Sequence, residues 1–162
     1  MEGKTSRKLH LIVYHRALFK AHWALFIPSV GDPNLGRSIH AVGDARTGFQ
    51  VTFGRNYDVA TTGRSHSLIF LGYVDAAYID DASTSGDGSH TTDHVPKDRI
   101  EDYAASVPAP GPSLRPSSSS SGNKRVEIRD CQTWLKDFIT VLVEAGVLHQ
   151  DSLDVINTAP EH

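Results

Sequence analysis

The stretch Ala21-His22-Trp23-Ala24-Leu25-Phe26-Ile27-Pro28 is the most informative part of the sequence for the fold. After its histidine the segment is apolar throughout, and it ends at a proline, which cannot donate to a strand ladder. This pattern predicts a buried strand over 22–27. Because successive side chains on a strand point to opposite faces, His22 and Trp23 are expected on different sides of the sheet.

Further strands are expected on both sides of this segment. Compact apolar or alternating runs occur at 9–14, 38–42, 49–53 and 66–74, and clusters of Gly, Asp, Pro and Asn separate several of them. Since these runs are short and closely spaced, they favour an antiparallel meander over β-α-β units. The first half of the chain therefore predicts a sheet of about five strands.

The second half is expected to hold helices and polar loops. Asp130 occupies an N-cap position, Gly146 suits the helix end, and between them apolar residues recur at helical spacing: Trp134, Leu135, Phe138, Ile139, Leu142 and Val143. The sequence also predicts short helices at 96–107 and 150–156, a brief extended segment at 125–128, and flexible polar loops at about 80–95 and 108–124. We expect one α+β domain over 1–162, with the antiparallel sheet packed on the C-terminal helix.

Composition argues against several classes of partner. The net charge is −3 and the pI about 6.3, so no basic excess exists to neutralise the phosphates of a nucleic acid. No apolar run is long enough for an integral membrane segment, and the first residues lack the apolar region of a signal peptide. A single cysteine cannot form an internal disulfide, so a reducing, cytoplasmic location is expected.

Three residues form a candidate catalytic group. Cys131 falls in the first turn of the best-defined helix, where the dipole and the helix-start N–H groups favour a thiolate. A nucleophilic cysteine also needs a base and a group that orients the base, and His22 and His40 meet if their strands pair. A lone helical cysteine is more often a small buried apolar residue than a nucleophile. The spacing alone leaves both roles open.

Three short blocks resemble a known enzyme group: Ala21-His22-Trp23-Ala24-Leu25-Phe26, Ile39-His40, and Asp130-Cys131-Gln132-Thr133-Trp134. They are similar to motifs of the lecithin:retinol acyltransferase and HRAS-like phospholipase/acyltransferase group, whose order His, His, Cys is that of the circularly permuted, NlpC-type papain-like fold. The resemblance implies Cys131 as nucleophile, His22 as base and His40 as orienting group, with no cofactor. The chain also resembles small uncharacterised fungal proteins.

The expected function is therefore a cysteine-dependent acyl hydrolase or acyltransferase. It would act on an ester or amide of a small molecule or peptide through a thioester acyl-enzyme. The expected substrate-binding residues are Arg55, Asn56, Asp58 and Trp23. Arg55 suits a bidentate contact to a carboxylate, whereas a turn in which Asn56 and Asp58 bond their own backbone is the alternative.

A second function hypothesis is a catalytically inactive papain-like module used for binding or scaffolding. The Pro/Ser-rich loop at 108–124 would then contact a protein partner.

No metal site is expected. His90 and His94 have i, i+4 spacing, but the glycines just before them argue against the helix that this spacing requires. The catalytic candidates Cys131, His22 and His40 are residue types that zinc accepts, and this interpretation ranks behind acyl transfer.

Overall fold

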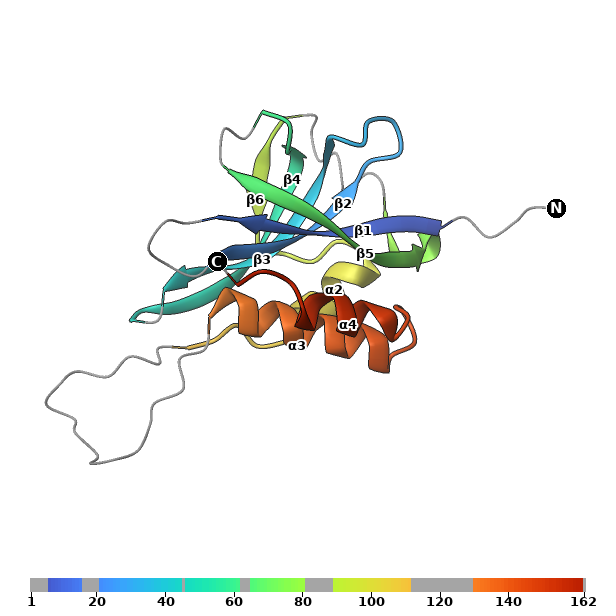
Figure 1. Cartoon of the computed structure of the whole chain (residues 1–162). Coiled ribbons are helices and arrows are strands. Elements are labelled where there is room, and N and C mark those ends of the chain that lie inside the picture. Colours follow the sequence, from blue (N-terminus) through green and yellow to red (C-terminus); the bar gives the residue numbers. More distant parts are fainter. Residues whose placement is uncertain are drawn as a thin grey trace, which may run out of the picture.

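The fold is a single antiparallel sheet with helices on one of its faces (Figure 1). The computed structural model describes residues 6–15, 21–44, 46–61, 65–80, 89–111 and 130–161. The strands are β1 (Ser6–Tyr14), β2 (His22–Pro28), β3 (Leu35–Asp44), β4 (Gly48–Asp58), β5 (His66–Asp75) and β6 (Thr91–Asp93), in the sheet order β5-β1-β2-β3-β4-β6. The helices are α2 (Arg99–Ser106), α3 (Cys131–Glu144) and α4 (Asp151–Asn157), with a 3-10 turn η1 (Ala76–Tyr78). The expected α+β class with an antiparallel sheet is confirmed.

The sixth strand corrects the expectation of about five strands. Strand β6 lies within 80–95, the segment expected as a loop, and pairs with β4 through Phe53↔Asp93 and Arg55↔Thr91. Three residues are too few to show the alternation by which a strand is recognised in a sequence. An ion pair fixes this short strand, because Nη2 of Arg55 lies 3.3 Å from Oδ2 of Asp93.

The strand register separates the side chains into two clusters. In β1 and β2 the pairs Leu11↔Leu25 and Val13↔Trp23 point to the helices, and Ile39 of β3 continues this row opposite Leu25. We call the buried residues on this side the helix-side core. A smaller cluster on the opposite face, here the second cluster, consists of Ile12, Tyr14, Ala24, Phe26 and Val59, with Tyr57 packed against it.

Helix α3 begins and ends where its sequence predicts. Asp130 accepts hydrogen bonds from the backbone N–H groups of Gln132 and Thr133 and forms a capping box with Thr133. Beyond the other end, Gly146 has φ of 78°, the left-handed conformation that follows many helices. Of the expected loop at 108–124, only 108–111 lie in the described ranges, and the extended segment expected at 125–128 lies outside them.

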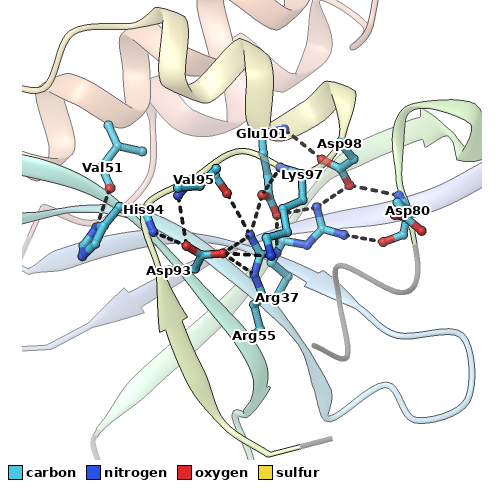
Figure 2. Close-up of polar contacts among 10 residues, drawn as sticks. All are labelled: Arg37, Val51, Arg55, Asp80, Asp93, His94, Val95, Lys97, Asp98 and Glu101. Carbon is cyan, nitrogen blue, oxygen red and sulfur yellow. Dashed lines mark hydrogen bonds and ion pairs between the residues drawn. The ribbon is translucent and has the colours of Figure 1, made fainter. Parts of the chain in front are cut away.

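A carboxylate with no exposed surface, that of Glu101 in α2, lies between two arginines of the sheet (Figure 2). Arg55 donates two bonds to it, Nη1 to Oε2 and Nη2 to Oε1, each 2.8 Å long. Nη1 of Arg37 in β3 lies 2.9 Å from the same Oε2 and donates to Oδ2 of Asp98 over 2.6 Å. Because a buried charge is tolerated only when it is paired, these contacts fix where α2 lies on the sheet.

The same network organises the start of α2. Oδ1 of Asp98 caps the helix by accepting from the N–H of Glu101, and its Oδ2 accepts from the N–H of Asp80. Hydrogen bonding to Glu101 raises the pKa of Arg55 above its already high ordinary value, so this arginine is a cation at every accessible pH. The positive charge of Arg55 is therefore a permanent part of the network.

Replacement of the central carboxylate tests this role. We expect Glu101→Gln to lower the free energy of unfolding by about 3–5 kcal/mol, because both arginines then lose a buried negative partner. Urea unfolding followed by circular dichroism measures the change. The matched control is Asp102→Asn on the exposed side of the same helix, which should change stability by less than about 0.5 kcal/mol. A loss below about 1 kcal/mol for Glu101→Gln would contradict a structural role.

Candidate active site

Two histidines from neighbouring strands are joined by a hydrogen bond. Nε2 of His22, at the start of β2, lies 2.7 Å from Nδ1 of His40 in β3, and the ring centroids are 5.0 Å apart at 64°. One ring nitrogen must donate and the other accept, so the bond fixes complementary tautomers in the two rings. His22 is 8% exposed, which keeps its imidazole away from bulk water. The structure thus brings together two of the three expected catalytic residues.

Cys131 is the first residue of α3, is in no disulfide bond, and is 8% exposed. Two N–H groups of this helix start, those of Gln132 and Thr133, are used by the side chain of Asp130 at 3.1 Å each. These two amides of the helix start therefore already have an acceptor.

The start of α3 is tied to the start of β2. Nε2 of Gln132 donates to the carbonyl oxygen of Ala21 at 2.8 Å and to that of Glu161 at 3.0 Å. The N–H of Ala21 donates to the same Glu161 carbonyl at 2.7 Å. Residues adjacent in sequence to Cys131 and to His22 are therefore bonded directly to each other, and the C-terminal segment completes the junction.

The two candidate residues belong to different sides of the sheet. Cys131 is part of the helix-side core, together with Ala21 and Trp23. The ring of His22 stacks on that of Tyr14 in the second cluster, with centroids 5.8 Å apart. Any approach of the thiol to the imidazole therefore takes place around the end of the sheet, where β2 begins.

Tyr14 lies against the histidine pair and is bonded to Tyr57, and sequence reasoning singled out neither tyrosine. The hydroxyl oxygens of Tyr14 and Tyr57 lie 2.5 Å apart, and Tyr57 also contacts the ring of His90 at 5.5 Å. The ring of His66 lies 6.1 Å from that of Tyr14. Tyr14 is found only once the register Tyr14↔His22 is known, because nothing in its local sequence distinguishes it from a core residue.

The residues expected to bind substrate have other contacts. Arg55 is 3% exposed and bound to Glu101, and Trp23 is fully buried with its Nε1 donating to the carbonyl of Pro160 at 3.0 Å. Asp58 accepts from the N–H of Ala60 at 2.9 Å, which is the turn that sequence analysis gave as the alternative. Asn56 has φ of 55°, so it adopts a turn-like left-handed conformation. Within the segment 55–58, Tyr57 is connected to the histidine pair, because its hydroxyl is bonded to Tyr14, which stacks on His22.

The described ranges hold neither a metal-binding group nor a membrane-spanning helix. No three His, Cys, Asp or Glu side chains there form a group suited to hold a metal ion, and this includes His22, His40 and Cys131. Within the same ranges, no helix has the length and apolar character to cross a membrane.

Comparison with known proteins identifies a family without an assigned activity. A family of unknown function, DUF6540, matches residues 9–149, which include the histidine pair and Cys131. No curated protein and no solved structure matches the chain. Because the match extends over most of the sequence, the chain belongs to the DUF6540 family.

Proposed function

We propose that this protein is a cysteine-dependent acyl hydrolase or acyltransferase of the permuted papain-like type, with Cys131 as nucleophile. The observation that carries the proposal is the 2.7 Å hydrogen bond between Nε2 of His22 and Nδ1 of His40. A general base must be held in one tautomer and one orientation, and a second polar residue bonded to its far nitrogen does this.

The proposed reaction assigns one role to each residue. His40 orients His22, and Nδ1 of His22 takes the proton of the Cys131 thiol. The thiolate attacks the carbonyl carbon of an ester or amide, and the amide N–H of Cys131 donates to the oxyanion. Collapse expels the alcohol or amine, which receives the proton from His22. Water or an acceptor hydroxyl or amine then cleaves the thioester and restores the thiol.

Support for the meeting of thiol and imidazole comes from the junction at the start of β2. The bond from Gln132 to Ala21 ties the residue after the thiol to the residue before the base. The stack of Tyr14 on His22 and the bond of Tyr14 to Tyr57 restrict the imidazole from the other side. A free thiol nucleophile also suits a reducing compartment, and we propose a cytoplasmic location on that basis.

A binding or scaffolding module is the second candidate function. It is favoured by the burial of Cys131 among apolar residues of the helix-side core, the usual environment of a structural cysteine. The Pro/Ser-rich segment that would contact a protein partner lies mostly outside the described residues.

Thiol labelling separates the two candidates. Because Cys131 is the single cysteine, iodoacetamide labelling followed by mass spectrometry reports on one site. We expect labelling near pH 7 to be faster than that of an ordinary thiol, of which only a few per cent is ionised, and His22→Ala to slow it about 10-fold. His149→Ala is the control, since that histidine is highly exposed and lies in the segment before α4. A labelling rate no higher than that of an ordinary thiol, and unchanged by His22→Ala, would overturn the enzymatic proposal.

Turnover of acyl donors tests the role of His40. In a screen of ester and amide donors, we expect Cys131→Ala to abolish activity and His40→Ala to lower kcat/KM by about 100-fold. His40→Asn should retain more activity than His40→Ala, because an amide can still hydrogen bond to Nε2 of His22. Equal activity of His40→Ala and wild type would show that the orienting bond has no part in catalysis.

A further inference from the structure

A cavity of about 510 Å³ lies on the face of the sheet opposite the helices, above β1. Its walls come from β1, from the end of β2 with the following turn, and from β5, and they consist of Ser6, Arg7, Lys8, His10, Phe26, Pro28, Ser29, Val30, Pro33, Asn34 and Leu68. The volume falls in the range of small-molecule sites, roughly 300–1,000 Å³. The described residues that form it belong to strands and a hydrogen-bonded turn, so the cavity is largely preformed.

The charge of this cavity is one-sided. Its lining holds two cationic side chains, those of Arg7 and Lys8, but no Asp or Glu, although the whole chain has a net charge of −3. Arg7 donates from Nη2 to the carbonyl of Pro28 at 2.7 Å, and this bond joins two residues of the cavity wall. Lys8 is exposed, and among the described residues no carboxylate pairs with it. An ammonium group therefore faces a cavity that offers it no counter-ion.

Apart from the polar residues Ser6, Ser29 and Asn34, the rest of the lining is apolar, and it includes flat rings. Phe26 forms a buried floor, and the ring of His10 packs edge-on against Phe70 at 5.8 Å. Burial, and secondly the charge of Lys8, lower the pKa of His10, so its ring is neutral near pH 7. Leu68 is 43% exposed at the rim. Aromatic and proline rings pack well against a flat ligand. A rigid flat ligand also loses less rotational freedom on binding than a flexible chain does.

We propose that this cavity binds an aromatic monocarboxylate, with the carboxylate toward Lys8 and the aromatic body between Phe26 and Leu68. The site is separate from the proposed thiol centre. Along the strand that begins with His22, Phe26 lies about 13 Å away and Pro28 about 20 Å away at the rise of a β-strand. The inference therefore stands or falls independently of the acyl-transfer proposal.

Titration of the full chain with matched ligands tests the inference. The probes are 2-naphthoate, its neutral analogue 2-naphthamide, and decanoate, and binding is followed by calorimetry and by shifts of the His10 imidazole signals in NMR spectra. We expect 2-naphthoate to bind with Kd below about 1 mM and to perturb His10, with both other ligands at least about 3-fold weaker. Tighter binding of decanoate would overturn the choice of an aromatic body. Equal binding of the amide would overturn the role of charge.

Two surface variants with matched controls localise the binding. We expect Lys8→Met to weaken 2-naphthoate about 3- to 5-fold and to leave 2-naphthamide unchanged, whereas Lys97→Met, which alters an exposed lysine outside the cavity, changes neither. Leu68→Asp should abolish binding. Its control is Val42→Asp, since Val42 is 44% exposed on β3 and does not line the cavity. Unchanged affinity in both Lys8→Met and Leu68→Asp would overturn the inference, and so would an absence of binding at about 1 mM.

Discussion

The buried carboxylate of Glu101 is the contact on which the arrangement of the helices depends. It holds α2 against β3 and β4 through Arg37 and Arg55, and no apolar contact could replace it without removing both arginines as well. The consequences reach α3, because just beyond the end of α2 the carbonyl of Val107 accepts a 2.9 Å bond from Nε1 of Trp134. Trp134 lies one turn after Cys131. Through this bond the Glu101 network contributes to the position of the thiol-bearing helix.

The two faces of the sheet carry different sets of side chains, because successive residues of a strand point to opposite faces. In β2 the row that includes Trp23 supports the helices, while the row that includes His22 and Phe26 lines the opposite face. A register slip of one residue in β2 would turn His22 toward the helices and Trp23 away from them. The bond of Trp23 to the Pro160 carbonyl opposes such a slip, because it fixes which row faces the C-terminal segment.

Local patterns in the sequence predicted much of this fold, whereas several contacts between residues distant in the sequence could not be predicted from them. The N-cap at Asp130 and the helical spacing after it place α3 correctly, since capping and amphipathic periodicity depend on neighbouring residues. The His22–His40 contact required only that successive strands pair. The partner of Arg55 is 46 residues away, and nothing near Arg55 distinguishes a substrate-binding arginine from a buried structural one. Strand β6 was missed for the same reason, because β4 and Arg55 stabilise it from outside.

The start of α3 shows why the histidine pair is central to the proposed chemistry. A helix N-terminus favours an anion, but here the carboxylate of Asp130 already occupies that position and accepts from Gln132 and Thr133. A second anion beside it is opposed by like-charge repulsion, so the helix alone does not favour a thiolate at Cys131. The proton acceptor must then supply the driving force. Within the proposal this makes the orientation of His22 by His40, rather than the helix dipole, the feature on which nucleophilicity depends.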